Sequence, residues 1–122
     1  MPLDLAALGT FWLAFALALI SPEMPTVALI PDDELTDRNL AAAEQVLARR
    51  GPLVAITHPG VDVAGLGSEE LHVPTVVVPK NEPELDPILL TIPLQVLAYH
   101  AALNRGLDID KPRNLAKSVT VE

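Results

Sequence analysis

The chain has 122 residues, of which half are hydrophobic and a fifth are charged. This length predicts one domain, and the apolar fraction excludes the intrinsically disordered class. Sixteen acidic residues against eight basic ones give a net charge of -8, so nucleic acid and anionic membranes are not expected as partners. Cysteine is absent, which excludes disulfide scaffolds, thiolate catalysis and cysteine-ligated zinc, and we take the cytoplasm as the default location.

An uncharged apolar segment opens the chain. Residues 5–20 read LAALGTFWLAFALALI, and the only charged residue ahead of them is Asp4. A bilayer span needs about 20 apolar residues, and a secretory signal needs basic residues before its apolar core. We therefore favour a helix that is buried or that packs against another subunit, so a homodimer is expected and membrane insertion is not.

The next segment predicts a strand followed by a helix. Residues 26–31 (TVALIP) form a short β-branched run bounded by prolines, which is typical of a buried strand. Asp32 and Asp33 follow, at a place where carboxylates stabilise the N-terminus of a helix. Apolar residues recur at helical spacing over 35–47, and Arg49, Arg50 and Gly51 predict the end of this helix.

The second half of the chain repeats this alternation. Residues 53–57 (LVAIT) and 75–78 (TVVV) predict two further strands, and the segment between them is interrupted by glycine and is expected to be irregular. Asp86 is expected to cap a helix over 87–105, in which Pro93 should kink or interrupt the first turns. Strands joined through helices pair in parallel, so the sequence predicts an α/β fold with a small parallel sheet of about three strands flanked by helices.

Few polar residues stand out as a functional site. His58 follows the second predicted strand, at the edge where parallel sheets bind ligands, but a lone histidine there is more often structural. His72 and His100 have no partners at metal-ligand spacing, so no metal site is expected. The acidic run that begins at Asp32 is explained more simply by helix capping than by a catalytic carboxylate pair. The GLG at 65–67 lacks the remaining glycine of a dinucleotide fingerprint, and no cofactor is indicated.

The end of the chain carries a family resemblance. Residues 93–122 (PLQVLAYHAALNRGLDIDKPRNLAKSVTVE) closely resemble the C-terminus of isomerising glutamine:fructose-6-phosphate aminotransferases, and DIDKPRNLAKSVTVE is the most specific part. Upstream, ALISPEMPTVALIPDDEL resembles the same family, so that the likeness covers residues 17–122. It implies a partial sugar-isomerase (SIS) domain, a three-layer α/β/α sandwich, over residues 1–122. Residues 1–16 are its atypical apolar segment and residues 107–122 its C-terminal tail.

The resemblance also implies a reaction and a site. Enzymes of this family add ammonia derived from glutamine to fructose 6-phosphate and isomerise the product to glucosamine 6-phosphate. Lys117 matches the tail lysine of the sugar site, where it contacts the open-chain sugar or forms a Schiff base, and Ala116 beside it offers backbone contacts. These two residues are the expected catalytic and substrate-binding positions, with fructose 6-phosphate or glucosamine 6-phosphate as the ligand class.

Two departures from the family limit what this chain is expected to do. The family carries Lys-His-Gly-Pro before the LALI sequence, whereas this chain has Leu-Ala-Phe-Ala at 13–16, so Ala14 stands in place of the ring-opening histidine. The family's catalytic glutamate and its phosphate-binding loop have no counterpart here. We expect a domain that binds a phosphosugar but is not catalytically competent alone. The alternative is an interaction module that homodimerises through its apolar N-terminal helix.

Overall fold

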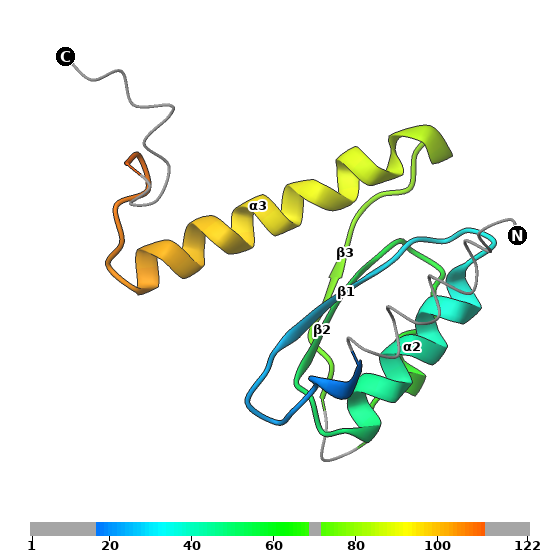
Figure 1. Cartoon of the computed structure of the whole chain (residues 1–122). Coiled ribbons are helices and arrows are strands. Elements are labelled where there is room, and N and C mark those ends of the chain that lie inside the picture. Colours follow the sequence, from blue (N-terminus) through cyan, green and yellow to red (C-terminus); the bar gives the residue numbers. More distant parts are fainter. Residues whose placement is uncertain (1–16, 69–71, 112–122) are drawn as a thin grey trace, which may run out of the picture.

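The computed structural model describes residues 17–68 and 72–111, which form a three-stranded parallel sheet with one helix on each face. The strands lie in the order β1 (Thr26–Ile30), β2 (Leu53–Thr57) and β3 (Thr75–Val77), so that β2 is central. Figure 1 shows α2 (Thr36–Ala48) on one side of this sheet and α3 (Asp86–Asn104) on the other. The predicted α/β class with a small parallel sheet is confirmed.

The side chains of β2 alternate between two separate cores, as the pleat of a strand requires. Leu53 and Ala55 point into the core beneath α2, whereas Ile56 points to the opposite face and packs against α3. Four of the five residues of β2 are buried, which explains why the sequence LVAIT is apolar throughout rather than alternating. The Thr57 hydroxyl donates to the carbonyl oxygen of Ile30 at 2.7 Å, which ties the ends of β1 and β2 together.

The end of α2 shows why a glycine follows two arginines. Arg50 has a φ of 58°, the left-handed conformation that often terminates helices, and the Gly51 N–H donates to the carbonyl oxygen of Val46 at 3.1 Å. Gly51 itself is required for space rather than for its backbone angles. A Cβ atom there would lie 2.6 Å from Cγ2 of Ile20, a residue that packs against the core beneath α2.

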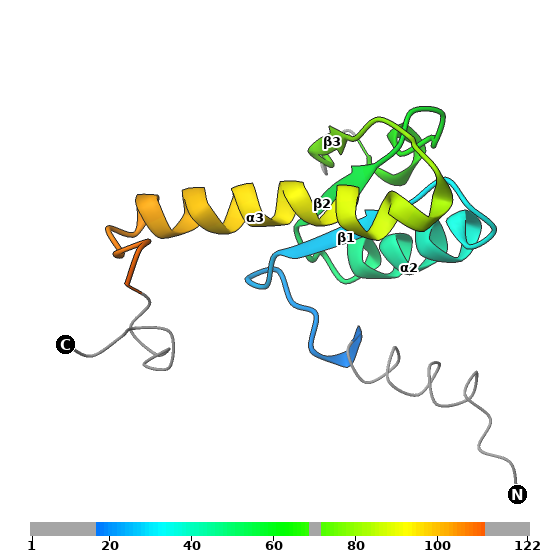
Figure 2. The same ribbon diagram turned by 90° about the horizontal axis from the view of Figure 1, so that it is seen from above.

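Helix α3 differs from its prediction at two points. Asp86 was expected as its N-cap but is its first helical residue, and the cap position is Leu85 in a short 3-10 turn, η2 (Pro83–Leu85). The helix continues without a break through Pro93, so of the two effects expected of this proline, a kink or an interruption, the interruption does not occur. In both views its C-terminal half projects beyond the sheet (Figures 1 and 2), so that Leu90 is buried while Leu97 is exposed.

The crossover from β2 to β3 contains no α-helix within its described residues. It holds one 3-10 turn, η1 (Ala64–Leu66), which lies on the α2 side of the sheet and packs through Val63 and Leu66 into the same core. The predicted irregular course of this segment is confirmed for its described part. Two other predictions, the apolar helix at the N-terminus up to residue 16 and the tail beyond residue 111, lie outside the described residues.

Candidate functional site

Polar side chains gather at the carboxyl edge of the sheet. Parallel strands end at one edge, and this is the usual position of ligand sites in open α/β sheets. Here Asp32 follows β1, His58 follows β2 and Lys80 follows β3, and α3 begins at this edge with Asp86. The four residues form two pairs: His58 with Asp86, which is buried, and Lys80 with Asp32, which is exposed.

His58 and Asp86 form the buried pair. His58 is 1% exposed, and its Nδ1 lies 2.9 Å from the carbonyl oxygen of Val78, so Nδ1 carries a proton and donates it. Its Nε2 lies 3.3 Å from Oδ1 of Asp86, close enough for an ion pair but without hydrogen-bond alignment. The ring therefore connects the end of β2 to β3 and to the start of α3. The ring is almost fully buried and joins three elements, as expected for the structural role favoured from the sequence, and it also forms part of the lining of the neighbouring cavity.

Lys80 and Asp32 form the exposed pair. The Lys80 Nζ donates to Oδ2 of Asp32 at 2.8 Å and to its backbone oxygen at 3.0 Å. The hydrogen bond from the Lys80 ammonium, together with its charge, lowers the pKa of Asp32 below its usual 3.8. In the same way the hydrogen bond to Asp32 raises the pKa of Lys80 above 10.5.

This pairing corrects the prediction that Asp32 and Asp33 both serve the N-terminus of α2. Neither aspartate caps α2, because its N-cap is Leu35 and no side chain caps it. In the loop just before the helix, the Oδ1 of Asp33 accepts from the N–H of Leu35 at 2.7 Å and the Asp33 N–H donates to Oγ1 of Thr36. Asp32 points to the segment after β3 instead. Sequence reasoning missed this pair because its members are separated by 48 positions and share no local pattern.

The Asp32 carboxyl should titrate below pH 3.8 in the folded protein. Its depressed pKa means that the pair favours the folded state above the unfolded pKa, and that this contribution is lost as the pH falls through the folded pKa. We expect the carboxyl ¹³C shift of Asp32 to show its midpoint below 3.8, and Lys80→Met to move that midpoint upwards. Lys111→Met, which removes a lysine elsewhere, should leave it unchanged. An Asp32 midpoint that ignores Lys80→Met would contradict the pairing.

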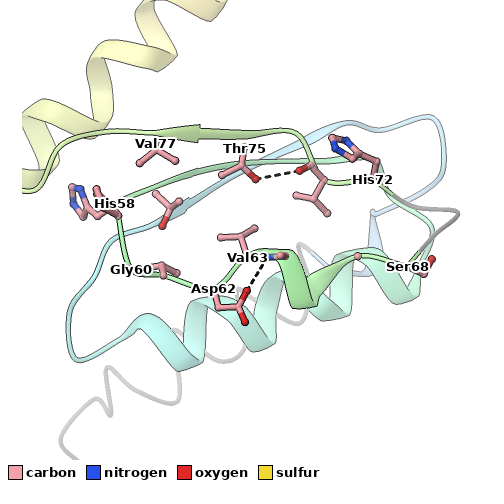
Figure 3. A pocket seen from close by; sticks show the side chains of 14 residues that line it. His58, Gly60, Asp62, Val63, Ser68, His72, Thr75 and Val77 are labelled. Carbon is pink, nitrogen blue, oxygen red and sulfur yellow. Dashed lines mark hydrogen bonds between the residues drawn. The ribbon is translucent and has the colours of Figure 1, made fainter.

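A cavity of about 810 Å³ opens beside the buried histidine (Figure 3). It lies between β3 and the crossover that follows β2, and its polar lining includes Thr57, Asp62, Ser68, His72 and Thr75. Asp62 is the charged side chain of this lining, and its Oδ1 accepts from the N–H of Ala64 at 3.1 Å. Because no lysine or arginine lines the cavity in the described part of the chain, it does not offer a counter-charge to a phosphate group.

Residues 17–68 and 72–111 contain no evident metal site and one long apolar helical stretch. Within these ranges no cluster of three or more histidine, aspartate or glutamate side chains is arranged to hold a metal ion. One helical stretch there, Pro83–Asn104, is long and apolar enough to cross a membrane by length and composition, and only 11% of its most apolar window is buried. Helices of soluble proteins can have the same length and apolar composition, so this stretch is weak evidence for a membrane span.

Comparison with known proteins identifies the family. No family model matches the chain. Glutamine–fructose-6-phosphate aminotransferases (isomerizing) from Escherichia coli O6:H1 and Neisseria meningitidis serogroup A are 44% and 46% identical to it over 106 residues, which are 87% of this chain. The solved C-terminal domain of glucosamine-fructose-6-phosphate aminotransferase from Francisella tularensis matches 79% of the chain at 34% identity, with a TM-score of 0.69. The chain thus matches a segment of the C-terminal sugar-isomerase domain of these aminotransferases.

The segment is a small part of its relatives. It spans 17% of the length of each of the two aminotransferases and 26% of the solved Francisella domain. The sequence identity to these aminotransferases confirms the family resemblance, and the match to the solved domain confirms the SIS-type sheet. The two residues that the resemblance selected, Ala116 and Lys117, lie outside the described residues, so their placement in a sugar site stays a prediction.

Proposed function

We propose that this chain is a phosphosugar-binding part of an SIS domain, with a ligand of the fructose 6-phosphate or glucosamine 6-phosphate class. The supporting observation is the 44–46% identity, over 87% of the chain, to aminotransferases named for fructose 6-phosphate. Because the chain spans a sixth of those enzymes, the whole reaction is not assigned to it. The whole chain is proposed to be one partial SIS domain, with residues 107–122 as its C-terminal tail. Its proposed location is the cytoplasm.

The described residues at the carboxyl edge of the sheet do not themselves provide a phosphate site. Phosphate recognition in proteins relies on lysine or arginine side chains and on helix N-termini. At the carboxyl edge of the sheet Lys80 is already paired with Asp32, and Asp86 places a carboxylate at the N-terminus of α3. The neighbouring cavity holds Asp62 and no cation among its described lining. A phosphosugar would therefore depend on residues outside this edge, and the tail lysine is the candidate.

Lys117 is the residue assigned to the sugar, and Ala116 supplies backbone contacts beside it. A lysine amine contacts an open-chain sugar carbonyl by a hydrogen bond when protonated, or attacks it when neutral. Neither action completes an isomerisation, which also needs a base to move a proton between adjacent carbons. The chain is thus expected to show weak binding and no formation of glucosamine 6-phosphate from fructose 6-phosphate and ammonia.

The replacement Lys117→Ala tests this proposal. Amide shifts of the isotope-labelled protein should respond to millimolar fructose 6-phosphate or glucosamine 6-phosphate, and the response should disappear in Lys117→Ala. Lys111→Ala removes a lysine of the same tail and should leave the response intact. A response that survives Lys117→Ala, or a wild-type chain that ignores both sugar phosphates, would refute the assignment. Catalytic turnover by the wild-type chain would show that it is an enzyme by itself.

The second candidate is an interaction module that forms homodimers. The apolar segment at the N-terminus was the surface expected for this from the sequence, and it lies outside the described residues up to residue 16. The specific observation that favours self-association comes from another element. Helix α3 exposes large apolar side chains along its whole length.

A further inference from the structure

The buried contact between His58 and Asp86 brings together two polar atoms that have no other partner. The Nε2 atom of His58 and the Oδ1 atom of Asp86 lie 3.3 Å apart, and neither makes a hydrogen bond within the described part of the chain. The two side chains are 0% and 9% exposed. Because the described residues themselves bury this contact, its burial does not depend on any further segment.

The number of protons on the imidazole ring decides whether this contact attracts or repels. The Nδ1 atom of His58 already donates its proton to the carbonyl oxygen of Val78 at 2.9 Å. A neutral ring has only this proton, so its Nε2 would present a lone pair to the carboxylate oxygen. Two buried acceptors that face each other lose their hydration and gain no hydrogen bond. A second proton, on Nε2, turns the same contact into an attraction between an imidazolium and a carboxylate.

The contact lies where α3 is attached to the sheet. His58 follows β2, and Asp86 is the first residue of α3. Beside this contact, α3 packs on the sheet through the small core of Ile56, Val78 and Leu90, whereas the core beneath α2 is a separate cluster. Loss of the attraction is therefore expected to loosen α3 and to leave α2 in place.

Other titratable side chains lie near the pair, namely Asp32 and Lys80 at the carboxyl edge and Asp62 and His72 in the cavity lining. Lys80 and Asp32 pair with each other at 2.8 Å and are each 45% exposed, so solvent and salt screen their effect on the buried pair. The hydrogen bond and the charge of Lys80 are the main causes of the lowered pKa of Asp32, and the charge of His58 adds a smaller effect of the same sign. The proton on His58 is therefore governed chiefly by its contact with Asp86.

We propose that the docking of α3 on the sheet depends on a proton, which Nε2 of His58 holds against the Asp86 carboxylate. This inference does not depend on sugar binding. When α3 is undocked, the ring binds this proton with the ordinary affinity of histidine, which corresponds to a pH of about 6.5. The docked pair holds the proton more tightly, so the contact stabilises α3 fully below that pH. The stabilisation is lost as the pH rises through the titration of the docked pair.

Amide hydrogen exchange of the full chain at a series of pH values tests this proposal. Protection factors correct for the intrinsic pH dependence of exchange, and one proton changes them by at most about tenfold per pH unit. Above a pH of about 6.5 the protection of α3 should fall at up to this rate, while the protection of α2 should stay constant. Protection of α3 that does not change with pH, or an equal fall in α2, would overturn the proposal.

The variant Asp86→Asn should abolish the pH dependence and keep α3 docked. The asparagine amide donates a hydrogen bond to Nε2 of a neutral ring, so this contact no longer needs a proton from solvent. The matched controls are His72→Gln and His100→Gln, which remove the two exposed histidines, the second of them within α3. Each control should keep the wild-type profile. A fall of protection in Asp86→Asn as large as in the wild type would contradict the proposal, and so would a control that loses the profile.

The ring nitrogens of His58 report the proton directly. In ¹⁵N spectra of the labelled wild-type chain, both ring nitrogens of His58 should remain protonated at a pH above about 6.5, where the exposed rings of His72 and His100 have become neutral. Loss of the Nε2 proton of His58 together with those of the other two histidines would refute the proposal. Because this measurement uses the wild-type chain, it is decisive even where a variant does not fold.

Discussion

Replacing His58 with leucine is expected to destabilise the fold by about 3 kcal/mol. The replacement removes the ring that lies 3.3 Å from the Asp86 carboxylate, and Asp86 is itself only 6% exposed. It also deprives the Val78 carbonyl oxygen of the proton that Nδ1 donates. A buried carboxylate without its partner costs more than the pair contributed, because the charge has lost water as well as histidine.

Urea unfolding, followed by circular dichroism, measures this effect. His72→Leu is the matched control, since it makes the same substitution at an exposed histidine and should change the free energy of unfolding little. The double variant His58→Leu with Asp86→Leu removes both polar groups, so it should lose less stability than the two single losses added together. If the losses simply add, the His58–Asp86 contact does not contribute to stability.

Shortening Ile56 to alanine is expected to cost about 3 kcal/mol through the cavity that it leaves. Ile56 is 2% exposed and forms, with Val78 and Leu90, the small core that holds α3 against the sheet. The core beneath α2 contains many more buried residues and does not include Ile56. The loss should therefore fall mainly on the attachment of α3.

Amide hydrogen exchange locates the damage. In Ile56→Ala, protection should decrease most in α3, while α2 and β1 keep most of theirs. Val76→Ala makes a smaller truncation on the same face of the sheet, at a side chain that is 44% exposed, and should cost under about 1 kcal/mol. Equal loss of protection in α2 and α3 would show that the two cores unfold as one unit.

The strands were predictable because their signals are local. The bounds predicted for β2 coincide with those observed, and the predictions for β1 and β3 each extend one residue too far. In all three cases a short β-branched or apolar run ends at a proline or at a polar residue. The parallel pairing followed from the helix and the crossover that separate the strands, since such connections return the chain in the same direction.

The carboxyl edge was not predictable, because its contacts join residues far apart in the chain. An aspartate before a proline at a helix start is the usual sign of a cap, and the sequence does not show that Asp86 instead meets a histidine 28 positions earlier. Asp32 was misassigned for the same reason, since Lys80 gives no local signal. The continuity of α3 through Pro93 is a further case, because the sequence left a kink or an interruption open and the interruption does not occur.

The two site residues in the tail were predicted from the family resemblance alone, and they lie outside the described residues. Lys117 was selected because RNLAKSVTVE matches a family sequence, and the aminotransferase relatives support the family without placing this lysine. Physical reasoning from the residues alone would have left it an ordinary charged side chain near the end of an acidic chain.

Helix α3 is attached to the sheet at its N-terminal end only. Its contacts with the sheet lie in its first turns, through Leu90 and the Asp86 carboxylate, and the rest of the helix extends beyond them (Figure 2). If the helix tilted by about 10° about these contacts, the C-terminal end of a helix roughly 28 Å long would move by about 5 Å. The tail that carries Lys117 follows that far end. Contacts that hold α3 against the sheet therefore also limit how far the point from which this tail continues can move.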